Sequence, residues 1–288
     1  METGKVIVEK VRGKSTVTKC FSKYPLKFII PRKVGSSESE AVWIYTITYG
    51  GGIVSGDSIA CDIIVGNGCT TVLTTQASTK VYKAVGSKCS EQMLERQVFK
   101  AMSDSSLLIV DWMTSGRHER GEKWDFDLYK STNHIFHDGD EPLFLDTILL
   151  EQGTDAGLAE RMQDYQVTAM VILLGPKLKH VQNQIQEDVK KIMSESLHMP
   201  TIGSRQYTSR HNDHNLTKPS FLASCSVFGP KVWLRLRTHH PPQTPLVGSH
   251  WGIGVVTRIA AVTTESVYNF LQHQLSSMEP LLGVRPYS

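Results

Sequence analysis

The sequence lacks the features that identify secreted, membrane-spanning and nucleic-acid-binding proteins. The five cysteines form no C-x-x-C pair, which excludes an evident metal site or disulfide framework and indicates reduced thiols. The first ten residues contain no apolar signal region, and no apolar stretch approaches the roughly 18 residues of a membrane span. A formal net charge of +3 is too small for a dense nucleic-acid-binding face. We therefore expect a soluble cytoplasmic protein that binds neither nucleic acid nor membrane.

Catalytic motifs are also missing. Gly13-Lys14-Ser15 ends like a phosphate-binding loop, but Val8 stands where that loop requires a glycine. There is no G-x-S-x-G elbow. His134 and His137 lie three apart on a predicted strand, so they would point to opposite faces and could not bind one ion together. The sequence predicts a protein that is not an enzyme; a metal-dependent hydrolase and an unrelated β-rich binding module are the alternatives.

Most of the chain shows strand patterns. Short segments rich in β-branched and aromatic residues are separated by turn signals such as Gly66-Asn67-Gly68. This spacing is typical of layered sheets rather than of β-α-β units. The predicted strands are 42–48, 59–65, 69–76, 107–113, 124–129, 133–137, 143–150 and 165–174.

Two segments instead show the period of a helix. Apolar residues recur at intervals of three and four along about 177–198 and again along about 264–282. Two further segments, 200–220 and 232–252, show neither period and are predicted to be flexible surface loops. The sequence thus predicts a mainly β fold of stacked β-sheets with two α-helices, and we treat residues 1–288 as a single domain.

Three aspartates stand out among the carboxylates. Asp57 follows a glycine run, and Asp111 and Asp146 lie inside apolar strand patterns, where a carboxylate is costly unless it is paired, hydrated or bound to a cation. For Asp111 and Asp146 singly, a structural role is the simpler interpretation. Several such acids together favour a hydrated acidic passage, whose oxygen ligands suit a divalent metal in transit. Glu122, five residues after Arg117, is interpreted as its ion-pair partner.

Several longer motifs follow one another along most of the chain. They are Gly51–Asp57 (GGIVSGD), Leu73–Lys83 (LTTQASTKVYK), Asp111-Trp112, Ser115–His118 (SGRH), Gly121–Trp124 (GEKW), Pro142–Asp146 (PLFLD) and Ala159–Arg161 (AER). In this order they resemble the motifs of UreD, the urease accessory protein family called UreH in some bacteria. Their amino-acid sequences are similar to those of the plant members of the family.

The resemblance implies a scaffold for urease maturation. Such proteins join the helical accessory protein UreF and the nickel-carrying GTPase UreG, and the assembly docks on apo-urease. Nickel would be in transit through a water-filled tunnel, with no cofactor bound tightly. The positions that match tunnel-associated residues of the family are Asp57, Ser78, Asp111 and Asp146, together with Glu122.

The chain departs from the family pattern at two places. Residues that the family carries are missing between Glu95 and Arg96, and we expect their loss to expose sheet edges. Conversely, Trp233–Trp251 is an insertion without periodicity.

Overall fold

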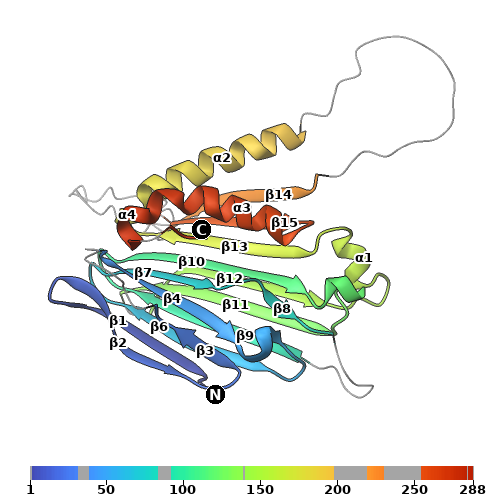
Figure 1. Cartoon of the computed structure of the whole chain (residues 1–288), viewed down its shortest axis with the longest axis horizontal. Coiled ribbons are helices and arrows are strands. Elements are labelled where there is room, and N and C mark those ends of the chain that lie inside the picture. The colour runs from blue at the N-terminus through green and yellow to red at the C-terminus, as the bar shows by residue number, and fades with distance from the viewer. Residues whose placement is uncertain are drawn as a thin grey trace, which may run out of the picture.

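Two stacked β-sheets form the body of the protein, and helices pack on the outer side of one of them (Figure 1). The computed structural model describes residues 2–31, 39–83, 92–138, 140–197, 219–229, 254–283 and 285–287. The predicted fold class, mainly β with stacked sheets, is confirmed.

Sheet A is the uncovered layer. Its six strands, in spatial order, are β12 (Glu141–Glu151), β11 (Leu128–His137), β9 (Gln92–Ala101), β6 (Ser58–Val65), β1 (Gly4–Val11) and β2 (Lys14–Ser22).

Sheet B lies against it and carries the helices on its other face. Its main path is β14 (Phe221–Phe228), β15 (Gly254–Ala261), β13 (Val167–Leu174), β10 (Ser106–Ser115), β7 (Thr70–Thr75), β4 (Ala41–Thr48) and β3 (Leu26–Ile29), with β5 (Gly52–Ile53) and β8 (Thr79–Val81) joined beside β10.

Several neighbouring strands are parallel although no helix connects them. The pairs β6–β9 and β9–β11 in sheet A, and β4–β7 and β7–β10 in sheet B, are all parallel. The chain achieves this by crossing between the sheets, because β7 and β10 of sheet B alternate in sequence with β6, β9 and β11 of sheet A. The layered sheets are therefore as the strand spacing predicted, with one exception. The helix α2 (Lys179–Leu197) connects β13 to β14, which run parallel because both are antiparallel to β15, so these elements form one β-α-β crossover.

Both predicted helices are present. The first is α2 (Lys179–Leu197), and the second comprises α3 (Thr264–Leu275), a 3-10 turn (Ser276–Met278) and α4 (Glu279–Leu282). A short helix, α1 (Leu158–Met162), and 3-10 turns at Tyr49–Gly51, His118–Arg120 and Pro176–Leu178 complete the helical elements of the described residues. None of these helices has the length and apolarity of a membrane span.

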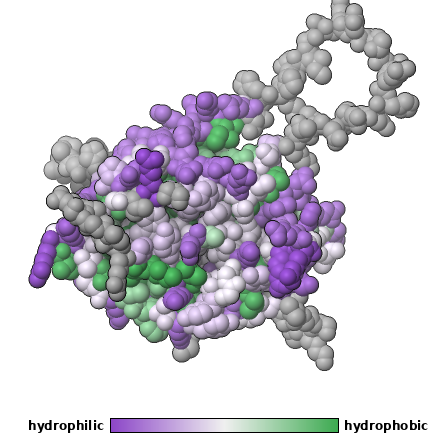
Figure 2. All heavy atoms as spheres, viewed as in Figure 1, coloured by the Kyte–Doolittle hydropathy of each residue, from purple (hydrophilic) through white to green (hydrophobic). Residues whose placement is uncertain are grey.

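Two hydrophobic cores lie on the two faces of sheet B. The inner core fills the space between the sheets and includes Ile63, Phe99 and Ile109. The outer core joins sheet B to the helices through residues such as Val181 and Ile185 of α2. Polar side chains cover α2 in Figure 2, whereas apolar ones gather lower in that view, where the N-terminal strands lie.

Two expectations from the sequence are corrected. The predicted strand 124–129 begins only at Leu128, because Trp124 has a positive φ of 55° and packs with Phe126 into the inner core. The predicted sheet edge near Glu95 is also absent, since this residue lies in the middle of β9 and is paired on both sides, with Ile59 of β6 and Ser131 of β11.

The two predicted flexible loops cannot be compared with the fold. Apart from Pro219 and Ser220, the segments 200–220 and 232–252 lie outside the described residues, as does the insertion Trp233–Trp251.

Candidate functional site

A set of polar side chains lies between the two sheets. Alternation along β10 directs Ile109 and Met113 into the inner core and Val110 and Trp112 into the outer core, so Asp111 faces sheet A. Opposite it, β11 and β12 contribute further polar groups. We call this set the inter-sheet polar cluster; its members are Glu95, Asp111, Tyr129, Asn133, Asp146 and Arg258.

Hydrogen bonds connect the members in three pairs. The Asn133 amide Nδ2 donates to Asp111 Oδ2 at 3.3 Å, and Asn133 stands opposite Asp146 in the register of β11 and β12. Asp146 Oδ1 pairs with Arg258 Nη2 at 2.5 Å. The Tyr129 hydroxyl donates a very short hydrogen bond to Glu95. The structure therefore brings Asp111 and Asp146 together through Asn133.

Burial disfavours negative charge on these carboxylates. Burial raises the pKa of Glu95 to about 8, and the charge of Asp111 adds to the effect. Burial also raises the pKa of Asp111, against the hydrogen bond from Asn133, while the charge of Asp146 raises it further. With a pKa of about 8, Glu95 is mostly protonated at neutral pH.

Unsatisfied acceptors remain inside the cluster. Asn133 Oδ1 and Asp146 Oδ2 are buried, and neither has a hydrogen-bond partner among the described residues. Beside Asp111, a cavity of about 10 Å³ is lined by Tyr129, Ser131 and Thr168, among others. This volume is room for about one water molecule, so the arrangement can hydrate the carboxylate without opening a wide channel.

The cluster is not a tight metal site. Across the described ranges, no group of three or more histidine, cysteine, aspartate or glutamate side chains is arranged to hold a metal ion. Its oxygens could accept hydrogen bonds from the water shell of a hydrated cation more readily than form a closed coordination sphere.

Asp57 lies apart from the cluster, in the turn between β5 and β6. Its Oδ2 accepts the Val54 N–H at 3.1 Å, and its own N–H donates to the Val54 carbonyl at 3.0 Å. Its carbonyl accepts the Leu94 N–H at 3.0 Å, which attaches the turn to β9. In this structure the Asp57 carboxylate closes a turn.

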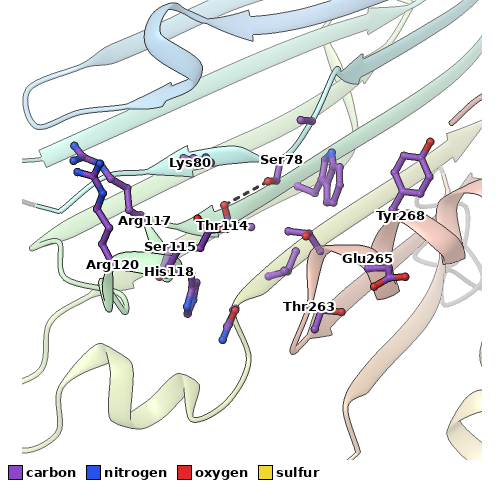
Figure 3. A pocket seen from close by; sticks show the side chains of 17 residues that line it. Ser78, Lys80, Thr114, Ser115, Arg117, His118, Arg120, Thr263, Glu265 and Tyr268 are labelled. Carbon is purple, nitrogen blue, oxygen red and sulfur yellow. Dashed lines mark hydrogen bonds between the residues drawn. The ribbon is translucent and has the colours of Figure 1, made fainter.

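Ser78 lines a second region, a surface cavity of about 700 Å³ between the end of β10 and the start of α3 (Figure 3). Its hydroxyl lies 3.4 Å from that of Thr114. We call this cavity the basic pocket; it is lined by Ala77, Ser78, Lys80, Trp112, Thr114, Ser115, Gly116, Arg117, His118, Glu119, Arg120, Gln166, Val167, Thr263, Thr264, Glu265 and Tyr268.

Glu122 does not line the basic pocket itself but contacts the lining residue Arg117. Its Oε2 accepts the backbone N–H of Arg117 at 3.0 Å, and its Oε1 lies 3.9 Å from the Lys83 ammonium. The predicted ion pair with the Arg117 side chain is therefore wrong: the contact is to the backbone, and the cation is Lys83. Gly116, with φ of 27°, allows the close approach, since a Cβ there would stand 2.7 Å from Glu122 Oε2.

Four members of the cluster were not singled out from the sequence. These are Glu95, Tyr129, Asn133 and Arg258, which come from three different strands and carry no motif. The one available signal was alternation, because Asn133 occupies an inward position between Ser131 and Ile135.

Fold and site together define a β-sandwich with a cluster of polar groups enclosed between its two sheets. Comparison with known families identifies it further. The family model described as "UreD urease accessory protein" matches residues 3–101 and 92–288, and the chain belongs to this family.

Individual relatives agree with the family match. "Urease accessory protein D" of Arabidopsis thaliana is 52% identical over 315 positions covering all of both chains, and its counterpart in Oryza sativa subsp. japonica is 50% identical over 99% of this chain and 94% of its own. "Urease accessory protein UreD" of Sorangium cellulosum is 31% identical over 61% of this chain and 62% of its own. The predicted likeness to the plant branch is confirmed.

The alignments also bear on the missing residues. The Arabidopsis alignment is longer than the 288 residues of this chain, so that relative has residues with no counterpart here. The two family matches overlap at residues 92–101, which form β9. The predicted gap between Glu95 and Arg96 lies in this overlap.

Proposed function

We propose that this protein is a non-catalytic scaffold of urease maturation that joins UreF and UreG to apo-urease and lets nickel pass between its two sheets. A role in urease maturation is supported by relatives named urease accessory proteins along the whole chain. The partners, the passage and a cytoplasmic location belong to the proposal.

The observation that carries the passage is the position of Asp111 and Asp146. Both carboxylates project between the sheets, Asn133 lies between them, and buried acceptor oxygens remain unsatisfied there. Unpaired buried oxygen atoms cost free energy, which a hydrated cation could recover. Nickel is the cargo in this proposal. Because the cavity beside Asp111 has room for about one water molecule, the ion would exchange part of its water shell for the oxygens of Asp111 and Asp146 as it passes.

Activation of apo-urease tests the proposal. Purified UreF, UreG, nickel and GTP are combined with apo-urease and either this protein or its Asp111→Asn or Asp146→Asn variant. We expect both variants to lower the yield of active urease several-fold while retaining UreF binding, because the changed groups are internal. The exposed Asp155→Asn is the matched control. Activation by both internal variants at the control level would contradict the passage.

A second measurement addresses the scaffold role. The purified protein alone should hydrolyse neither GTP nor urea, and turnover of either would support the metal-dependent hydrolase instead.

A further inference from the structure

The basic pocket carries more positive than negative charge. Lys80, Arg117 and Arg120 line it, and within the described residues none of them forms an ion pair. The Arg117 guanidinium instead lies 5.4 Å from the centre of the Tyr82 ring. Its carboxylates are Glu119 and Glu265.

The two carboxylates lie at different places in the pocket, since Glu119 belongs to the 3-10 turn that also carries Arg120, whereas Glu265 belongs to α3. In Figure 3 the side chains of Arg117 and Arg120 extend side by side from one wall, whereas Glu265 and Tyr268 belong to α3 on the opposite wall. Glu265 lies in the first turn of α3, where a carboxylate stabilises the helix dipole. The two arginine side chains thus come from one wall, and neither forms an ion pair with another described residue.

Buried groups of the lining also lack partners. Trp112 is only 4% exposed, and its indole N–H has no acceptor among the described residues. His118 Nε2 is buried without a partner as well. Burial, with the charge of Lys123, lowers the pKa of His118, so its ring is neutral near pH 7 and can donate through one nitrogen. A buried donor without an acceptor is unfavourable unless a ligand or water supplies one.

The arrangement selects the chemistry of the ligand. Paired guanidinium groups, hydroxyls of Ser78 and Thr114, and an indole N–H are mostly donors, and oxyanions are acceptors with several lone pairs. A hydrated metal cation would be repelled by the same wall. The volume of about 700 Å³ lies within the range of small-molecule sites.

We propose that the basic pocket is a binding site for a small oxyanion, a phosphate or a carboxylate, held by Arg117, Arg120 and the indole N–H of Trp112. The site lies on the outer side of sheet B and is separate from the inter-sheet polar cluster. It does not depend on the proposed role in nickel transfer.

Calorimetric titration of the full chain with inorganic phosphate and, separately, with acetate tests this site. We expect saturable binding of at least one anion, and the tighter one identifies which oxyanion the site takes. Arg117→Gln and Arg120→Gln should each weaken binding about tenfold, because a hydrogen bond to a charged group is worth at least that factor. Trp112→Phe keeps an aromatic side chain but removes the indole N–H together with the five-membered ring, and should also weaken binding.

Controls separate binding from folding. Arg96→Gln changes the same charge on the exposed face of β9 and should bind as the unaltered protein does. The urea midpoint of each variant shows whether it is folded; Arg117 and Arg120 are exposed, so at least one of the two changes should leave the midpoint unaltered. Asp111→Asn should retain anion binding even if it impairs urease activation. The site is refuted if neither anion gives saturable heat, or if the arginine variants and Arg96→Gln bind equally well.

Discussion

Glu95 gives the free energy of unfolding a defined pH dependence. Its pKa of about 8 in the folded protein lies above the ordinary value of roughly 4.3 expected on unfolding. Between these values the folded state binds more protons than the unfolded state, so the free energy of unfolding falls as pH rises through that window. We expect Glu95→Gln to remove a slope of up to about 1.4 kcal/mol per pH unit.

Urea unfolding from about pH 5 to about pH 8 measures this slope. Glutamine keeps an acceptor for the Tyr129 hydroxyl, so the change isolates the charge. Equal slopes for the variant and the unaltered protein would show that Glu95 does not titrate in this window.

Arg258 and Asp146 form an ion pair with one buried and one accessible member. The Asp146 side chain is 12% exposed and that of Arg258 is 43% exposed. Arg258→Met leaves Asp146 unpaired, and we expect it to cost about 1–2 kcal/mol, less than a fully buried pair because water reaches the arginine. Adding Asp146→Asn to Arg258→Met should restore most of the lost free energy of unfolding, because no unpaired charge then remains.

A double-mutant cycle by urea unfolding tests this coupling. Arg285→Met removes a partner of Glu279 in a pair whose members are both exposed, and it should leave the free energy of unfolding nearly unchanged. Additive effects of the Arg258 and Asp146 changes would contradict the coupling.

At the scale of elements, the turn from β13 into α2 depends on Gly175. Its φ is 101°, and a Cβ there would stand 2.1 Å from the Ser105 carbonyl oxygen. We expect Gly175→Ala to lower the free energy of unfolding by about 2 kcal/mol or more. Gly13→Ala is the matched control, since Gly13 has φ of 78° but open space around it, and should cost about 1 kcal/mol. Thermal or urea unfolding compares them, and equal costs would show that backbone strain alone, without the clash, explains the effect.

Elements with a strong period could be predicted from the sequence, and those shaped by tertiary contacts could not. The apolar stripe of α2 and the alternation in β6 arise because each element buries one of its faces, so both elements were predicted from the sequence. The segment 124–127 resembled a strand because its aromatic residues pack into the inner core, although its backbone is irregular. The edge strand β2 was missed because its mostly exposed residues carry little pattern.

The candidate site was predicted only in part for a similar reason. Asp111 and Asp146 were recognisable as charges within apolar strands. Their neighbours Glu95 and Arg258 come from β9 and β15, and such proximity depends on strand order, which no local spacing encodes.

At the scale of the whole molecule, sheet B couples the two cores. Its inner face contacts sheet A and its outer face contacts α2 and α3, so loss of either core should disrupt the same strands. We expect one cooperative unfolding transition. Variants that retain tryptophan fluorescence only at Trp112, in the outer core, or only at Trp124, in the inner core, should report the same urea midpoint as circular dichroism. Separate midpoints would show that the layers unfold independently.

The position of β15 has a consequence for the nascent chain. Sheet B is ordered β14-β15-β13, so the strand made last in this sheet, Gly254–Ala261, lies between two strands made earlier. Until the ribosome has released that segment, β13 and β14 have no common partner, and each presents unpaired backbone groups along an apolar strand. A chain that stops translation before residue 254 is therefore a substrate for chaperones or proteases, and the protein completes its second sheet only after Gly254–Ala261 has left the ribosome.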